Sequence, residues 1–164
     1  MELRCLTELD WQQFRDLRLL ALRNEPGLFS ATLAVEAGKD QAWWQARVQS
    51  ERHQVFGVFS GHELAGMIGV FTDWYDPSDA TAVIGMLFVA PVHRGKGLSR
   101  RLFDAALEWV RARPHFLRAT VGHRASNEAS MRAILRQHFV ERGRTSHLWP
   151  DGTTEDEVTY LLEL

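Results

Sequence analysis

Residues 89–101 read VAPVHRGKGLSRR, and this stretch decides how the rest of the chain is interpreted. The residues that lead into it, 82–89, are an apolar run of β-type composition, which predicts a central strand buried on both faces. The residues that follow it repeat apolar side chains at helical spacing until Pro114 ends the pattern. The stretch is therefore predicted to be a glycine turn between a buried strand and an amphipathic helix.

The predicted turn has the chemistry of a phosphate-binding site. The first backbone N–H groups of a helix have no partner within the helix and lie at the positive end of its dipole. Gly95 and Gly97 would let these groups approach a ligand without a Cβ in the way. Arg94, Lys96 and Arg100 add positive charge around that point. We therefore expect a phosphorylated or pyrophosphorylated small molecule as the ligand.

Two other glycine motifs fit this turn poorly. A P-loop requires a glycine five residues before the glycine that precedes its lysine, and this chain has none there. The dinucleotide fingerprint requires a third glycine where this chain has Arg100. Binding of ATP or NAD is therefore the weaker alternative. A glycine turn whose basic residues are merely solvated is a second alternative.

Hydrophobic periodicity outside the turn predicts an alternation of strands and helices. Strands are predicted over residues 3–6, 54–59, 64–72, 82–89, 116–123, 139–149 and 153–164. Helices are predicted from about residue 11 to 24, around Trp43-Trp44, from 98 to 113, and after an N-cap at Ser126. The crossover between residues 82 and 123 requires one parallel pair, whereas the hairpins require antiparallel pairs. We expect an α/β fold with a mixed, mostly antiparallel sheet of about seven strands and helices on both faces.

The composition is that of one soluble globular domain. The chain has 164 residues, of which 45% are hydrophobic and 24% charged, with a net charge of −2. We expect a single domain, residues 1–164, that binds neither nucleic acid nor membranes. Cys5 is alone and the histidines lack the spacing of a helical metal pair, so we expect no metal. We find no signal-peptide pattern and expect a cytoplasmic protein.

The run Arg94-Gly95-Lys96-Gly97-Leu98-Ser99, between a strand and a helix, resembles the signature of the GCN5-related N-acetyltransferases (GNAT). The family pattern is Arg/Gln-x-x-Gly-x-Gly/Ala, and Ser99 stands where glycine or alanine is usual. The resemblance extends through the strand order over nearly the whole chain. It implies a GNAT-like acyl-CoA N-acyltransferase fold that uses acetyl-CoA as co-substrate. It also implies an acceptor that is a small-molecule or peptide amine, and it leaves a homodimer open.

The resemblance also implies roles for individual residues. The pyrophosphate would lie on the N–H groups from Gly95 to Ser99, and the pantetheine arm along residues 87–89. The Leu87 N–H would polarise the thioester carbonyl in a gap between two strands. Asn127 would contact the arm, although a helix-start role is the alternative. The implied cofactor-binding set is Leu87, Phe88, Val89, Arg94, Gly95, Lys96, Gly97, Leu98, Ser99 and Asn127.

The chain departs from the family pattern after Asn127. Many members have a tyrosine seven residues later, which protonates the departing thiolate, but this chain has Ile134. A thiolate with a pKa of about 8.5 needs no acid to leave. Alternatively Ser126 or Ser130 could donate the proton. A third alternative is a non-catalytic domain that only binds acyl-CoA.

A general base is harder to identify from the sequence. His123 ends the strand next to the expected thioester, and histidine is the side chain that most often acts as a general base, so it is the first candidate, with an ordinary strand-end histidine as the alternative. The carboxylates of other candidates are more often solvated surface charges, and a bound water could replace any of them. These candidates are Glu36, Asp40, Asp156 and Glu157.

Overall fold

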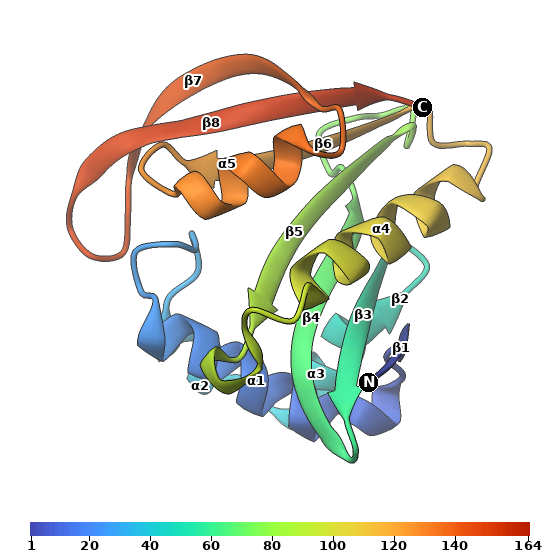
Figure 1. The fold of residues 1–164 in the computed structure, drawn as a ribbon, viewed down its shortest axis with the longest axis vertical. Coiled ribbons are helices and arrows are strands. Elements are labelled where there is room, and N and C mark those ends of the chain that lie inside the picture. Colours follow the sequence, from blue (N-terminus) through green and yellow to red (C-terminus); the bar gives the residue numbers. More distant parts are fainter.

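The computed structural model describes residues 1–164 as an open, twisted sheet with helices packed on both of its faces (Figure 1). The strands run in the order β1-β3-β4-β5-β6-β8-β7, and the two-residue β2 pairs with β3. Their bounds are β1 (Glu2–Cys5), β2 (Gln49–Ser50), β3 (His53–Ser60), β4 (Glu63–Thr72), β5 (Thr81–Val89), β6 (Arg118–Arg124), β7 (Val140–Leu148) and β8 (Thr154–Glu163). Only β5 and β6 pair in parallel, so the mixed, mostly antiparallel sheet expected from the sequence is confirmed.

Five α-helices and two short 3₁₀ helices connect the strands. They are η1 (Glu8–Asp10), α1 (Trp11–Asn24), α2 (Leu33–Ala37), α3 (Gln41–Val48), η2 (Pro91–His93), α4 (Leu98–Arg111) and α5 (Glu128–Leu135). The sequence analysis expected neither α2 nor β2, because elements of two to five residues are too short to show a period. None of the helices has the length and apolar character needed to cross a membrane.

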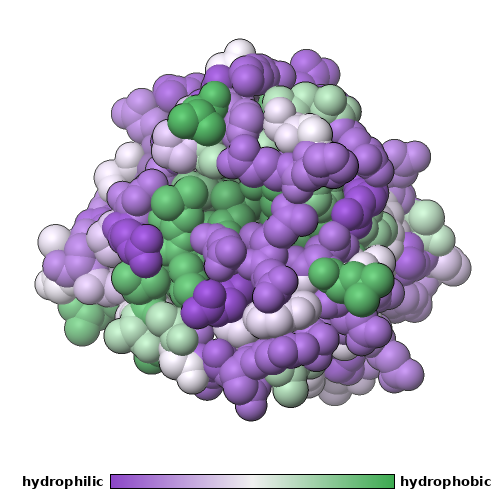
Figure 2. Space-filling model, turned by 90° about the horizontal axis from the view of Figure 1, so that it is seen from below, coloured by the Kyte–Doolittle hydropathy of each residue, from purple (hydrophilic) through white to green (hydrophobic).

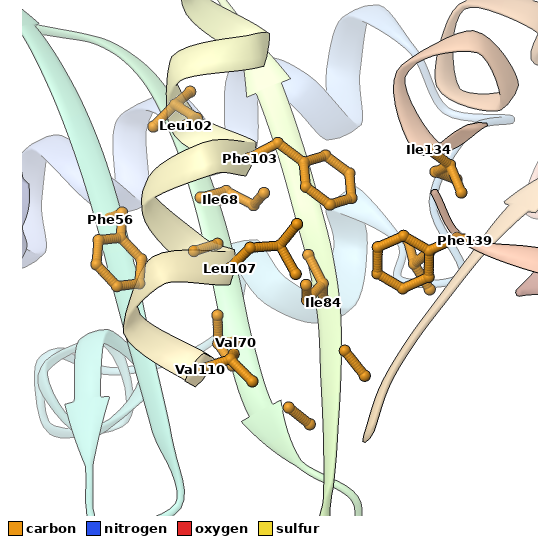
Figure 3. Close-up of a cluster of buried hydrophobic side chains, with 14 of the residues drawn as sticks. Phe56, Ile68, Val70, Ile84, Leu102, Phe103, Leu107, Val110, Ile134 and Phe139 are labelled. Atoms are coloured by element: carbon orange, nitrogen blue, oxygen red, sulfur yellow. The ribbon is translucent and has the colours of Figure 1, made fainter. Parts of the chain in front are cut away.

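Each face of the sheet has its own hydrophobic core. On one face, Leu102 and Leu107 of α4 pack on Ile68 and Ile84 of the central strands, and Phe103 meets Phe139 edge-on at 5.9 Å between ring centroids (Figure 3). On the other face, side chains of α1 and α3 pack against β3 and β4. Trp44 of α3 is fully buried there.

The start of α5 corrects one prediction. Asn127, not Ser126, is the N-cap, because its side-chain oxygen accepts the Ser130 N–H. The Ser126 hydroxyl is turned the other way and donates to the carboxylate of Glu155 on β8. The serine therefore joins α5 to the last hairpin instead of capping the helix.

The central strand β5 parts from its neighbour β6 halfway along its length. The two strands pair only from Thr81↔Arg118 to Ile84↔Val121. Beyond that point β5 bulges: Gly85 pairs with Gly69 and Phe88 with Met67, which leaves Met86 and Leu87 without a partner in register. Met86 has a φ of 58°. The prediction of a strand buried on both faces is therefore wrong for residues 85–87, which are half-buried because β6 has moved away.

Candidate active site

A pocket of about 370 Å³ occupies the gap between β5 and β6. Its walls come from β5, β6, the glycine turn, α5 and the segment after α1. Figure 2 shows the molecule from below, with apolar residues gathered in the middle of the face and hydrophilic residues around them. Every residue of the implied cofactor-binding set except the exposed Lys96 lines this pocket, and so does His123: Leu87, Phe88, Val89, Arg94, Gly95, Gly97, Leu98, Ser99, His123 and Asn127.

The glycine turn presents a row of unpartnered backbone donors. Gly95 and Gly97 have φ values of 77° and 71°, which glycine adopts without strain. The first backbone bond of α4 runs from the Arg101 N–H to the Gly97 carbonyl. None of the N–H groups from Gly95 to Arg100 donates to a protein acceptor, and no side chain caps the helix. This end of the pocket is therefore built to accept an anion.

Two hydrogen bonds fix the Arg94 side chain beside these donors. Its Nε donates to the Val89 carbonyl at 3.0 Å, and its Nη2 to the Glu25 carboxylate at 2.5 Å. Glu25 also lines the pocket. The Arg94 charge is thus partly balanced by a carboxylate that the sequence analysis did not select. Lys96, by contrast, forms no ion pair, so its charge is unbalanced.

Asn127 caps α5 and also lines the pocket. Its Oδ1 accepts the Ser130 N–H at 3.2 Å. Its side-chain NH₂ forms no bond within the protein and remains available to a ligand. Ser130 lines the pocket too, and its hydroxyl has no protein partner.

His123 is buried at the pocket wall with both ring nitrogens engaged. Its Nδ1 lies 2.6 Å from the Arg124 carbonyl, and its Nε2 lies 3.0 Å from the Tyr160 hydroxyl. A carbonyl only accepts, so Nδ1 carries the proton and Nε2 accepts from the tyrosine. Burial raises the pKa of Tyr160, which keeps the hydroxyl protonated as a donor.

The four carboxylates considered as bases have other positions in the fold. None of them is part of its lining. Glu36 is buried against Arg18, and Asp40 caps α3 by accepting the Trp43 N–H at 2.8 Å. Asp156 and Glu157 lie in β8 opposite Ser146 and Thr145. His123 lines the pocket and these carboxylates do not, so His123 is the better placed of the candidate bases.

The geometry fits what comparison with known proteins shows. Residues 7–139 match the Acetyltransferase (GNAT) family. The chain belongs to this family. No curated protein is significantly similar to it in sequence.

Solved structures share the GNAT fold along the whole chain. The yncA protein from Salmonella typhimurium, solved with its cofactor acetyl-CoA, has a TM-score of 0.83 at 19% identity, covering 100% of this chain and 94% of that one. A ribosomal-protein-alanine N-acetyltransferase from Brucella melitensis has a TM-score of 0.83 at 18% identity and full coverage of both chains. RimL, a ribosomal L7/L12 alpha-N-protein acetyltransferase in complex with coenzyme A, has a TM-score of 0.79 at 18% identity, covering 99% and 93%.

Besides Ile134, the chain departs from the GNAT pattern at His138, four residues further on, where glycine is common. The two departures differ in their structural consequences. Ile134 lines the pocket and is 2% exposed, so an apolar side chain packed into the core replaces the usual tyrosine. His138 has a φ of 66°, a left-handed conformation that explains why glycine is common at this position. The left-handed turn at residue 138 is therefore retained, whereas the tyrosine hydroxyl usual at position 134 is absent.

Sequence reasoning missed residues at the other end of the pocket. Phe29, in the segment between α1 and α2, lines it. Two arginines of the first helices, Arg18 and Arg47, contact the pocket-lining residues Phe29 and Met86. Nothing in the sequence marks them, since Arg18 is one of three arginines in α1 and Arg47 is an ordinary basic residue in the last turn of α3. Only the packing of α1 and α3 on the sheet brings them together.

Proposed function

We propose that the protein is an acetyl-CoA-dependent N-acetyltransferase, in which a primary amine attacks the thioester directly within a ternary complex. The observation that supports this most strongly is the row of unpartnered N–H groups from Gly95 to Arg100 at one end of the pocket. A diphosphate accepts hydrogen bonds from such groups and is attracted by the helix dipole. Acetyl-CoA and CoA in similar structures support the same co-substrate.

Acetyl-CoA would supply the activated acetyl group, and this chain's residues would bind and orient it. The pyrophosphate binds the N–H groups of residues 95–99, with Arg94 and Lys96 adding charge. The pantetheine arm follows residues 87–89, where β5 has no β6 partner and its free edge can bond an extended chain. The Leu87 N–H donates to the thioester carbonyl and stabilises the charge that develops on its oxygen. The free NH₂ of Asn127 holds the arm from the other side.

The attacking amine must first lose a proton, since its pKa is about 10.4 when free. We assign the proton acceptor to His123, which lines the pocket. When Tyr160 turns its O–H away, Nε2 takes the proton from the amine and then donates a hydrogen bond to the phenolic oxygen. The thiolate, with a pKa of about 8.5, leaves without an acid. Ser130 is the alternative proton donor. Most of the rate then comes from positioning and carbonyl polarisation.

A thiol-release screen of acetyl-CoA against a library of amines tests the proposal. We expect at least one amine to release CoA thiol, with one acetyl group transferred per thiol. Gly97→Glu protein should be inactive, because a carboxylate then stands in the diphosphate site. Gly61→Glu is the matched control, since Gly61 has a similar φ of 62° and open space around it in the β3–β4 hairpin.

A second candidate is a non-catalytic acyl-CoA-binding domain of the same fold. Ile134 favours it, because a buried apolar side chain stands where an acid is usual. This candidate predicts that acetyl-CoA binds and that no amine in the library releases thiol. The catalytic proposal predicts release, and an Ile134→Tyr variant would then change the rate without creating the activity.

A further inference from the structure

Two arginine side chains lie close together on the α1–α3 side of the sheet, with Arg18 buried and Arg47 half-buried. Arg18 donates two hydrogen bonds to the Glu36 carboxylate, at 2.9 and 3.0 Å, while its Nη1 is buried without any acceptor. Arg47 donates only to the Met86 sulfur, at 3.9 Å. No carboxylate lies within ion-pair distance of Arg47. Glu36 therefore balances one of the two guanidinium charges and leaves the other in excess.

Arg47 is held in place without being neutralised. Its guanidinium carbon lies 5.8 Å from the ring centroid of Trp43 and 4.8 Å from that of Phe71. Burial and the charge of Arg18 lower the pKa of Arg47. A guanidinium has five N–H donors and a thioether is a weak acceptor, so most of its hydrogen-bonding capacity is unused. A half-buried cation in this state costs free energy, which a bound anion would offset.

Both guanidinium groups adjoin the wall of the pocket. The Arg18 carbon lies 5.1 Å from the ring centroid of Phe29, and Arg47 contacts Met86. Phe29 and Met86 line the pocket. Met86 also precedes Leu87, whose N–H is the proposed donor to the thioester carbonyl. The two arginines therefore lie next to the reacting group, on the side of the bulge away from α4.

We propose that the acceptor is a small amine bearing a carboxylate, and that this carboxylate binds the guanidinium of Arg47 in the field of Arg18. The inference rests on the proposed function and specifies its acceptor. Met86 directly precedes Leu87 in β5, so one small molecule can place its carboxylate at Arg47 and its amine at the thioester carbonyl. Amino acids meet this requirement. Polyamines do not, because they bring further positive charge to Arg18, Arg47 and the neighbouring Lys39, which lies 5.6 Å from the Trp43 ring.

Substitutions of Arg47 test whether its side chain binds an anion or only stabilises the fold. Arg47→Met removes a cation that has no ionic partner, so the thermal midpoint should stay the same or rise. Arg47→Lys keeps the charge but loses the bidentate fork and should behave as an intermediate. Arg113→Met is the matched control: Arg113 lies 3.4 Å from the Trp109 ring and has no carboxylate partner either, but it belongs to the α4 side of the sheet.

Turnover is compared for amino acids and for their primary amides, which are similar in size and carry no negative charge, at a pH at which both amines are largely unprotonated. In the wild-type protein we expect kcat/KM to be roughly 10–100-fold higher for the amino acids. In Arg47→Met the ratio should fall to about one, and in Arg113→Met it should not change. Equal rates for acids and amides in the wild type, or an unchanged ratio in Arg47→Met, would overturn the proposal. A preference for aminophosphonates over amino acids would overturn the choice of carboxylate.

A binding measurement distinguishes failure of this inference from failure of the proposed function. N-acetyl amino acids and their amides are titrated into the CoA complex while the arginine Nε signals are followed by NMR. We expect the acids to shift the Arg47 signal and to bind at least about tenfold more tightly. If they do so although no amine releases thiol, the anion site stands and the transferase proposal fails. If neutral amines release thiol and the acids bind no better than the amides, the anion site is overturned and the transferase stands.

Discussion

The two ends of the pocket are built in different ways. The proposed cofactor end is made from one continuous segment, residues 94–99, and its donors are backbone N–H groups. The proposed acceptor end is assembled from side chains of α1, α3, β5 and the segment after α1. Backbone donors bind any diphosphate in the same way, whereas side chains can be exchanged one at a time. We therefore expect the cofactor end to be common to the family and the acceptor end to determine which amine this protein uses.

We expect the largest effect from a substitution that disrupts only the proposed cofactor end. Gly97→Glu adds a Cβ at a φ of 71° and a negative charge beside the free N–H groups. We expect the dissociation constant for CoA, measured by calorimetry, to rise about 100-fold or more, which corresponds to about 3 kcal/mol. Gly61→Glu should leave it unchanged. Equal CoA binding by Gly97→Glu and wild-type protein would remove the cofactor end from the account.

A smaller effect is expected at the acceptor end. A Cβ at Gly69 would lie 2.7 Å from the Met86 methyl and 2.8 Å from the Phe71 ring, the two groups that contact Arg47. Gly69→Ala should displace them and raise the KM for the amine about tenfold, with CoA affinity unchanged. Gly143→Ala is the control, because its Cβ would meet nothing closer than 3.8 Å. A loss of CoA affinity in Gly69→Ala would mean that the two ends are not separable.

Asn127 tests whether a cofactor contact can be separated from helix capping. Asn127→Ala removes the cap bond to Ser130 and should lower the free energy of unfolding by about 1 kcal/mol. Asn127→Asp keeps an accepting oxygen but replaces the NH₂ donor. It should retain the stability in denaturant melts and weaken CoA binding severalfold. If Asn127→Asp protein binds CoA as tightly as the wild type, Asn127 only caps the helix and does not contact the cofactor.

The smallest effect concerns charge at the cofactor end. Lys96 is exposed and has no ion-pair partner, so it acts on the diphosphate only through solvent. Lys96→Ala should weaken CoA binding about two- to threefold at low salt. The difference from wild type should shrink as ionic strength rises. A salt-independent loss would instead indicate a direct, dehydrated contact.

The sequence predicts the cofactor end better than the acceptor end for a physical reason. The strand, the glycines and the amphipathic helix are neighbours in the chain, so their arrangement follows from local rules, and the fold class followed from the strand order. The bulge at Met86 and the pairing of His123 with Tyr160 depend on contacts between distant strands. Arg18 and Arg47 meet only because two helices pack on the same face. The local sequence favours Ser126 as a helix cap, because it gives no sign that the hydroxyl binds Glu155, which is far away along the chain.

The most direct test of the central claim is an amide NMR titration of the protein with CoA. The account predicts that the largest shifts occur at the N–H groups of Gly95, Gly97, Leu98 and Ser99, while Gly61 does not shift. Pantetheine, which lacks the diphosphate, should leave the turn unshifted. CoA binding that moves other amides and leaves these four unchanged would contradict the account.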